Sequence, residues 1–305
     1  MRTAFAAALL DMMAADERLW LVTGDLGYSV LEPIAQRFPG RYVNVGVAEQ
    51  NMTAVAAGLA HSGKIPFTYS IANFPTLRCL EQVRNDVVYN ALPVKIVAVG
   101  GGYAYGPQGY THHGVEDLAV MRTLPGMTVL APGDPVETDL LTRRLPGVPG
   151  PCYLRLGKAR EPVVHREPPP LEIGRAIRLR DGAAGTLIST GGMLPASVEV
   201  ADRLRHETGV SLRVLSMHTL KPLDTEAVLD AARDTGRILT VEEHTVVGGL
   251  GSAVAEVLAT RGPTGARLAL FGVPDRLTCA VGSQEYLRGL CGDLHAAARG
   301  LVTQS

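Results

Sequence analysis

Glu49 is a carboxyl group placed where an acid–base catalyst could act. It opens an apolar helical pattern directly after a short strand-like run, within NVGVAEQNM (residues 44–52). An acidic residue is common in the first turn of a helix, because the partial positive charge of the helix N-terminus favours it. A buried carboxyl at the same place would instead suit proton transfer. The position of Glu49 leaves both interpretations open.

Two adjacent histidines, His112 and His113, follow a glycine-rich stretch that runs from Gly100 to Gly109. Neighbouring side chains diverge, so the pair does not predict a shared metal ion, whereas the glycines would let the backbone pass close to a ligand. Either histidine could equally be a structural hydrogen-bonding residue. No G-x-S-x-G nucleophile elbow accompanies them, so the sequence does not indicate serine hydrolase chemistry.

Composition restricts the classes of protein that this chain can belong to. Its 305 residues are enough for two domains, and 29 Lys and Arg nearly balance 30 Asp and Glu. That balance argues against nucleic-acid or membrane-surface binding, and no apolar stretch approaches the roughly 20 residues of a membrane span. Because four cysteines lack metal-ligand spacing and are too few for a disulfide framework, we expect a reduced, cytoplasmic protein: Cys79, Cys152, Cys279 and Cys291.

The first 15 residues predict an amphipathic helix rather than a secretory signal. Phe5, Ala8, Leu9 and Met12 fall on one helical stripe, and Asp11 interrupts the apolar run that a signal peptide would need. A glycine pair at 249–251 also follows a strand-like run. The dinucleotide fingerprint fails there because position 254 is Val, so we expect a turn that enters a helix.

Strand-like runs alternate with helical patterns, which predicts α/β architecture with parallel sheets. The predicted strands span residues 19–22, 41–45, 65–69, 94–99, 127–130, 185–189, 212–216 and 238–241. A helix is expected from Glu49, and another that places Leu77, Leu80, Val83 and Val87 on one face. Further helices are expected up to residue 206, over 224–234 and after 251.

Three consecutive prolines, Pro168 to Pro170, interrupt this alternation. Proline can neither continue a helix nor join a central strand, so residues 161–173 predict a semi-rigid linker. We therefore expect one domain over residues 1–160, a linker over 161–174 and a second, smaller α/β domain over 175–305.

Taken together, the loops resemble the pyrimidine-binding domain of the transketolase family. The stretches that carry the resemblance are NVGVAEQNMTAVAAGLA, FPTLRCLEQVRND and GYTHHGVEDLAVMRTLPGMTVLAPGDPVE. Residues 175–260 resemble the carboxy-terminal transketolase domain, through LISTGGM, KPLD and VEEHTVVGGLGS. The resemblance implies two successive parallel-sheet α/β domains, the pyrimidine-binding domain followed by the C-terminal domain.

The resemblance also implies a missing partner. Complete transketolases carry an amino-terminal domain that binds diphosphate and Mg²⁺ through Gly-Asp-Gly and paired Asn residues. Here Leu26 follows Gly24-Asp25 and Met52 follows Asn51, so that motif is absent and we predict no metal site in this chain. The expected protein is the carboxy-terminal subunit of a split transketolase that uses thiamine diphosphate, with Mg²⁺ bound mainly by an N-terminal subunit.

Position by position, the resemblance assigns cofactor contacts to Glu49, Phe74, Asp25 and Leu77. Glu49 matches the Glu that hydrogen-bonds ring nitrogen 1′ of the aminopyrimidine, whose 4′ nitrogen then removes the proton from thiazolium carbon 2. Phe74 matches an aromatic residue that stacks on the pyrimidine, and Asp25 matches an acid near the thiazolium. Ile71 and Leu77 stand where the family often has further aromatic residues, which implies a more aliphatic pocket.

Substrate positions depart further from the family. His112 matches a catalytic His that contacts sugar hydroxyls, and Arg2, Ser29 and Lys158 match places that hold the sugar phosphate. Lys158 is usually Arg, and Lys lacks the bidentate fork. Gln108 stands where an Asp usually reads a substrate hydroxyl. These departures predict an unusual sugar.

Several functions fit this resemblance. We favour two-carbon ketol transfer by a heterotetramer of this subunit, which also dimerises with itself, and an N-terminal subunit. The alternatives are a deoxyxylulose-phosphate-synthase-like condensation, a 2-oxoacid dehydrogenase beta-type subunit and a non-catalytic regulatory subunit. The intact Glu49 and Phe74 favour an enzyme over the last of these.

Overall fold

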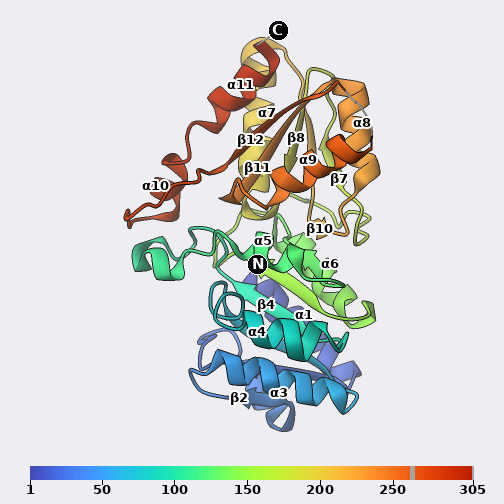
Figure 1. Cartoon of the computed structure of the whole chain (residues 1–305), viewed down its shortest axis with the longest axis vertical. Coiled ribbons are helices and arrows are strands. Elements are labelled where there is room, and N and C mark those ends of the chain that lie inside the picture. The colour runs from blue at the N-terminus through green and yellow to red at the C-terminus, as the bar shows by residue number, and fades with distance from the viewer. Residues whose placement is uncertain (262–264, 304–305) are drawn as a thin grey trace.

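The computed structural model describes residues 1–261 and 265–303. Two sheets follow one another along the long axis of the molecule (Figure 1), one built mainly from the first half of the chain and one from the second. Helices cover both faces of each sheet. None of the helices in these residues is long and apolar enough to cross a membrane, and the four cysteines are free thiols.

The first sheet has seven strands in the order β10-β5-β6-β4-β3-β1-β2. Six of them come from residues 19–156 and run parallel to one another: β1 (Leu19–Thr23), β2 (Tyr42–Asn44), β3 (Ile65–Ile71), β4 (Lys95–Val99), β5 (Thr128–Leu130) and β6 (Cys152–Leu156). Nearly every side chain of β3, β4 and β6 is buried. Burial on both faces explains why these strands are continuous apolar runs.

Two groups of helical segments cover the first sheet. One face carries α1 (Arg2–Ala15), α2 (Glu32–Arg37) and α6 (Pro135–Arg144). The other face carries α3 (Glu49–His61), α4 (Leu80–Gln82), the π-helix η2 (Val83–Val88) and α5 (Asp117–Thr123). The short 3-10 helices are η1 (Pro39–Arg41), η3 (Gly106–Gln108), η4 (Tyr110–His112) and η5 (Leu145–Gly147).

The second sheet has five strands in the order β12-β11-β8-β9-β7. They are β7 (Ile177–Arg180), β8 (Thr186–Ser189), β9 (Arg213–Ser216), β11 (Arg237–Thr245) and β12 (Arg267–Val273), and only β7 pairs antiparallel. The 3-10 helix η6 (Gly191–Met193) leads into α7 (Leu194–Thr208), which with α11 (Leu294–Thr303) covers one face. The other face carries α8 (Thr225–Thr235) and α9 (Leu250–Thr260), and α10 (Gln284–Gly289) lies beside the sheet.

The second half of the chain contributes a strand to the first sheet and packs against the first half. β10 (Thr219–Lys221) comes from the second half but pairs antiparallel with β5, so it completes the edge of the first sheet. Lys221 Nζ donates to the carbonyl oxygens of Arg122 and Leu124 at 2.9 and 2.5 Å. One hydrophobic core runs from α3 and α5 to α8 and α9. The halves therefore stabilise one another.

The predicted fold class is confirmed, with corrections in detail. Each sheet is mixed rather than purely parallel, because β10 and β7 run antiparallel, and the second strand is shorter than residues 41–45. The helix expected after β3 begins only at Leu80. Val83 and Val87 are buried as predicted, but Leu77 precedes the helix and is 46% exposed. The apolar stripe was wrong at Leu77 because a turn over residues 74–79 replaces the first helical turn.

The proline-rich connection is held in place rather than free. Asp134 caps α6 by accepting from the Glu137 amide at 2.8 Å, and its second oxygen accepts from the amides of Val164 and His165 at 2.9 and 3.0 Å. His165 Nε2 lies 2.9 Å from a carboxylate oxygen of Glu137. These bonds satisfy backbone donors that a connection without regular structure would otherwise leave unpaired.

Three successive side chains of β11 anchor three different elements. Glu242 accepts from the amides of Leu250 and Gly251 at the start of α9, both at 2.8 Å. Burial raises the pKa of Glu242 to about 7, although these bonds act in the opposite direction. His244 accepts from the Ala119 amide of α5 at 3.2 Å, and burial lowers its pKa to about 4. Glu243, between them, faces the loop that follows β4.

The pH dependence of stability follows from Glu242 and His244. Folding favours protonated Glu242, so the contribution of Glu242 to the free energy of unfolding falls as the pH rises from about 4.5 to about 7. Folding favours neutral His244, so the contribution of His244 to the free energy of unfolding rises as the pH rises from about 4 to about 6.5. The two trends oppose each other in the wild type. We expect the free energy of unfolding to rise with pH over this range in Glu242→Gln and to fall with pH in His244→Gln, measured by urea denaturation at a series of pH values. Parallel pH profiles in the two variants would contradict these assignments.

Candidate functional site

The candidate site lies where the parallel strands of the first sheet end. Because β1, β2, β3, β4 and β6 are parallel, their carboxyl ends lie at one edge of the sheet. The segments that follow them therefore gather at that edge, where ligands bind in open α/β sheets. These segments hold the residues singled out in the sequence: 24–29, 45–49, 72–78, 100–113 and 157–160.

Glu49 is the first residue of α3 and is 2% exposed. Its carboxylate oxygen lies 2.7 Å from Nη1 of Arg78, which is the ion-pair partner of this buried group. A Cβ atom at Gly24 would lie 3.4 Å from Cγ of Glu49, so the end of β1 packs closely against this side chain. Glu49 thus combines both expected features, a first-turn position and burial.

A chain of aromatic and cationic side chains extends from Glu49 to Lys158. The Arg78 guanidinium also lies over the Phe74 ring, 4.6 Å from its centroid. The Phe74 and His112 rings meet edge to face at 5.2 Å, and His112 lies 6.3 Å from the Tyr105 ring. Lys158 Nζ lies 4.4 Å from the Tyr105 centroid. The structure therefore brings Glu49, Phe74, His112 and Lys158 into one continuous cluster.

The two adjacent histidines have different environments. His112 is half-buried with Nδ1 3.0 Å from the Thr111 hydroxyl, and burial together with His113 lowers its pKa, which favours the neutral ring. His113 is buried, with Nε2 3.2 Å from the carbonyl oxygen of Gly106 and its ring edge to face with Tyr103 at 5.0 Å. His113 is a structural residue, and His112 faces the site.

The other predicted residues lie around this cluster with fewer contacts. Burial raises the pKa of Tyr105, and the charge of half-buried Arg2 acts against this effect, which places Arg2 near the Tyr105 end. Gln108 is exposed, and among the described residues no hydrogen bond joins its side chain to the cluster. Exposed Leu77 lines a groove of about 290 Å³ with Phe74 and Arg78.

Asp25 and Ser29 lie in a strained loop after β1. Both have positive φ, 56° and 64°, a conformation that costs energy for residues other than glycine. Asp25 accepts from the Asn44 side-chain amide at 2.9 Å and from the Tyr28 hydroxyl at 3.2 Å, whereas the Ser29 amide donates to Glu32 at 2.6 Å. Both are exposed at the outer end of β1, adjacent to the Gly24 contact with Glu49.

The chemistry of these groups fits an aminopyrimidine ring. A buried carboxyl group beside an aromatic face can donate its O–H to a ring nitrogen while the face packs on the ring, and the Arg78 guanidinium, which is also planar, already contacts both Glu49 and Phe74. Across residues 1–261 and 265–303, no group of three or more His, Cys, Asp and Glu side chains is placed to hold a metal ion.

Comparison with known families decides the relationship. Residues 1–162 match the model of the transketolase pyrimidine-binding domain, and residues 174–287 match that of the transketolase C-terminal domain. The chain belongs to the transketolase family. As a transketolase-type transferase subunit, it is a member of the thiamine-diphosphate enzymes.

Two relatives of similar length are named as transketolase subunits. The chain is 41% identical, over 90% of its length and 87% of the relative's, to a subunit of apulose-4-phosphate transketolase from Phocaeicola vulgatus. It is 38% identical, over 94% and 88% of the two lengths, to a subunit of 6-deoxy-6-sulfo-D-fructose transketolase from a Clostridium species. It is also 36% identical to 1-deoxy-D-xylulose-5-phosphate synthase from Desulforudis audaxviator, of which it spans 43%.

Solved structures agree with this relationship. A split-gene transketolase, described as an inactive beta4 tetramer, matches with a TM-score of 0.88 and 37% identity over 99% of this chain and 97% of that one. The predicted split-transketolase resemblance is confirmed. A Pichia stipitis transketolase has the same fold, with a TM-score of 0.77 and 21% identity over 99% of this chain and 45% of that one.

Sequence reasoning missed Arg78, although it stands inside a quoted motif. An arginine on the polar face of an expected helix predicts solvent exposure, and only the structure shows its guanidinium in contact with both Glu49 and Phe74. Sequence reasoning also missed the role of Glu243 in holding the loop after β4. The unusual pair of carboxyls inside an apolar strand, VEEH, was the available signal, because acidic residues are rarely buried without a partner.

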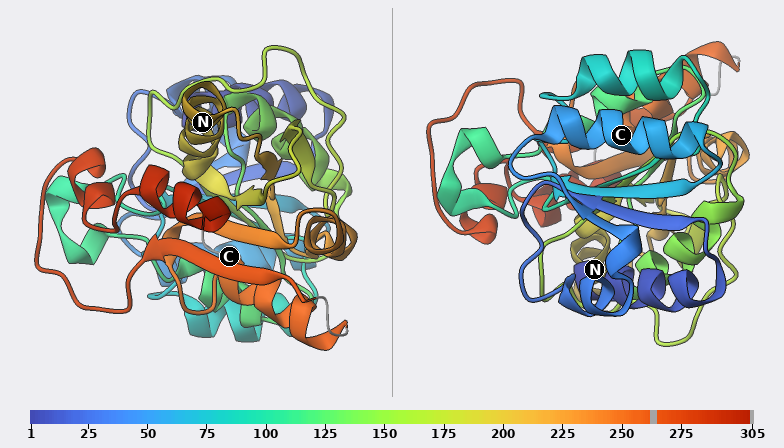
Figure 2. Two further views of the ribbon diagram at one scale, coloured as in Figure 1. Left: turned by 90° about the horizontal axis from the view of Figure 1, so that it is seen from above. Right: turned by 90° about the horizontal axis from the view of Figure 1, so that it is seen from below.

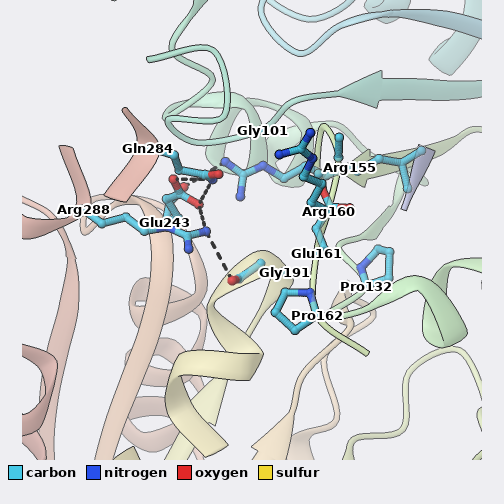
Figure 3. A pocket seen from close by; sticks show the side chains of 14 residues that line it. Gly101, Pro132, Arg155, Arg160, Glu161, Pro162, Gly191, Glu243, Gln284 and Arg288 are labelled. Carbon is cyan, nitrogen blue, oxygen red and sulfur yellow. Dashed lines mark hydrogen bonds and ion pairs between the residues drawn. The ribbon is translucent and has the colours of Figure 1, made fainter. Parts of the chain in front are cut away.

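Glu243 ties the loop after β4 to the second half. Its carboxylate accepts from the Tyr103 amide at 2.9 Å, from the Gln284 side chain at 3.0 Å and from Arg288 at 2.6 Å. Figure 3 shows Gln284 and Arg288 converging on Glu243 at one side of a cavity of about 140 Å³, with Gly101 and Arg155 also on its wall. The cavity therefore lies between the two halves of the chain, close to the start of the loop that carries His112.

The loop after β4, which carries His112, projects from the body of the molecule beside the segment around α10. Figure 2 shows the green segment around η3 and η4 beside the red segment around α10 in both views. The Gly282 amide donates to the Gly106 carbonyl oxygen at 3.4 Å, and Tyr103 packs in one apolar cluster with Leu287. The C-terminal half of this transketolase subunit thus supports the loop.

We expect Glu243→Ala to loosen the loop that carries His112. Removing the acceptor of the buried Tyr103 amide costs about one hydrogen bond to a charged group, so amide hydrogen exchange over residues 103–113 should become about tenfold faster. Hydrogen-exchange mass spectrometry of the purified chain measures this. Glu243→Gln keeps an acceptor and should restore much of the protection, and Gln284→Ala is a control that leaves Glu243 in place. An increase in exchange spread evenly over the whole chain would contradict a local positioning role.

Proposed function

We propose that this chain is the carboxy-terminal subunit of a two-subunit transketolase, which transfers a two-carbon ketol unit between sugars or sugar phosphates with thiamine diphosphate as cofactor. The observation that carries the proposal is a buried carboxylate, Glu49, beside the aromatic face of Phe74 at the carboxyl edge of the sheet. The names of two relatives, each a transketolase subunit, support a separate partner.

Each residue of the cluster has a distinct role in this proposal. Glu49 holds its carboxyl against a ring nitrogen of the aminopyrimidine, and Phe74 packs on the ring face beside Leu77. His112, in contact with Phe74, binds sugar hydroxyls as a neutral ring. Asp25 adds an acid near the reacting end. When bound, the cofactor supplies the electron sink that the transferred two-carbon fragment requires.

The phosphate end of the substrate lies at the opposite end of the cluster. Lys158, over Tyr105, and Arg2 provide two positive charges there. Ser29, in the loop after β1, would add a hydroxyl to the phosphate from the other side of the cluster. Lys158 binds phosphate as a point charge rather than through a bidentate fork. Gln108, exposed in η3, would face the substrate hydroxyl beside the reacting carbonyl. We infer that this end tolerates donors other than ordinary ketose phosphates.

The assembly completes the site. We expect an N-terminal subunit to hold the diphosphate and Mg²⁺, because this chain has Leu26 where the Gly-Asp-Gly motif needs glycine. Closed two-fold symmetry favours pairing of this subunit with itself and a heterotetramer with the partner. A structural relative that is an inactive beta4 tetramer supports both self-association and dependence on a second kind of subunit.

Glu49→Gln should remove cofactor activation without disturbing the fold. The amide keeps the size of the side chain but loses the acid–base capacity, so exchange of the thiazolium carbon-2 proton for deuterium should slow at least about 100-fold in the reconstituted complex. NMR of the bound cofactor measures this exchange. Glu81→Gln, at an exposed carboxylate on α4, is the matched control. Undiminished exchange in Glu49→Gln, with assembly intact by size-exclusion chromatography, would sink the assigned role.

Donor preference should reflect Gln108 and Lys158. An amide can donate as well as accept, so Gln108 relaxes the demand for a substrate hydroxyl that a carboxylate would impose. We expect kcat/KM for xylulose 5-phosphate below about 10⁴ M⁻¹s⁻¹, and better use of a modified donor. Apulose 4-phosphate and 6-deoxy-6-sulfofructose, named for the two relatives, belong in the panel.

The variants sharpen this test. Gln108→Asp should shift preference toward xylulose 5-phosphate, and Lys158→Arg should improve phosphorylated donors specifically. Efficient use of xylulose 5-phosphate by the wild type would refute the specificity argument but not ketol transfer. The synthase relative makes pyruvate with glyceraldehyde 3-phosphate the second reaction to assay. Turnover of that pair alone would favour the condensation over ketol transfer.

A further inference from the structure

Arg78 engages both groups that the proposed function assigns to the aminopyrimidine. Its Nη1 donates to Glu49 at 2.7 Å, and its Cζ lies over the Phe74 ring at 4.6 Å. A guanidinium is planar, donates N–H groups in its plane and stacks on aromatic faces. An aminopyrimidine ring would contact the same two residues, because it is planar, hydrogen-bonds through its edge and stacks through its face, although its ring nitrogen accepts where the guanidinium donates.

We propose that Arg78 takes the place of the cofactor's aminopyrimidine when the site is empty, so that cofactor binding must displace its side chain. This inference rests on the proposed function and adds a regulatory step to it. In the empty site, Arg78 supplies the cation that the nearly inaccessible Glu49 carboxylate needs. Loading exchanges the donating guanidinium for a ring nitrogen that accepts, so Glu49 takes up a proton from solvent as Arg78 leaves and is paired in both states.

The position of Arg78 suits such an exchange. Its side chain is 48% exposed and lies on the turn between β3 and α4, outside any helix or strand. Its backbone is fixed, because the Gln50 side chain donates to the Arg78 carbonyl oxygen at 3.1 Å. The guanidinium can therefore rotate into solvent while the backbone of the turn stays in place. Arg78 also lines the groove that contains Phe74 and Leu77.

Binding of the cofactor tests the displacement directly. In the reconstituted complex, Arg78→Ala removes the competitor, so the Kd for thiamine diphosphate measured by isothermal titration calorimetry should fall about fivefold, which corresponds to an ion pair with one half-exposed partner together with a cation–π contact. Arg84→Ala is the matched control, because Arg84 is exposed on η2 and bonds Asn85 rather than Glu49. Arg78→Lys keeps the charge without the planar fork and should give an intermediate Kd.

The outcomes separate this inference from the proposed function. An unchanged or higher Kd in Arg78→Ala would overturn displacement and indicate that Arg78 is neutral toward the bound cofactor or contacts it, while the proposed function would stand. Absence of binding by the wild-type complex would overturn the proposed function and this inference together. A lower Kd in Arg84→Ala as well would reduce the effect to general surface charge and overturn displacement.

The free chain provides a second readout that needs no cofactor. Arg78→Ala leaves the Glu49 carboxylate buried without its partner, so the Tm of the free chain should fall by about 2–4 °C, whereas Arg84→Ala should leave it unchanged. In a Glu49→Gln background, Arg78→Ala should have a much smaller effect. Equal decreases in Tm in both backgrounds would show that Arg78 does not stabilise the Glu49 carboxylate and would overturn the proposal that Arg78 takes the place of the aminopyrimidine.

Discussion

Arg155 is a cation held almost entirely out of water, and the arrangement of the site depends on how it is satisfied. Its Nε donates to Asp117 at 2.9 Å, and its Nη2 donates to the carbonyl oxygens of Gly114 and Glu243 at 2.6 and 2.9 Å. Loss of one partner from such a buried pair costs several kcal/mol, on the order of 3–5. β6, α5, β11 and the end of the loop after β4 are therefore constrained together.

This constraint divides the candidate site into a rigid and an adaptable part. Glu49 sits on α3 beneath a close contact with Gly24, and the loop that carries His112 is fixed through Tyr103 to Glu243. By contrast, the side chains of Gln108 and Arg78 are exposed at the rim. Chemistry that tolerates little displacement belongs on the rigid part. Under the proposed function, changes at the rim would alter substrate preference without disturbing the core.

The sequence predicted what depends on local pattern and missed what depends on distant partners. Long apolar runs located the buried strands, and the run beginning at Glu49 located the start of α3, because both signals lie within one element. β10 was missed because three residues carry no periodicity and their partner strand lies about ninety positions away in the chain. Leu77 was misplaced because a helical stripe and a turn followed by a π-helix look alike over a few residues. Arg78 was missed for a related reason, since its role exists only where two loops meet.

Burial of Glu49 connects stability to the division of the enzyme into subunits. A carboxyl group that is 2% exposed needs a hydrogen-bonding partner whether or not a cofactor is present. Under the proposed function this chain carries one half of a cofactor site, and a donor from the chain itself keeps Glu49 paired before the other half is present. Arg78 meets that need from a flexible side chain on a fixed turn. In the exchange proposed above, a buried residue in its place would satisfy Glu49 equally well but would block displacement, so the partial exposure of Arg78 is the property on which that proposal depends.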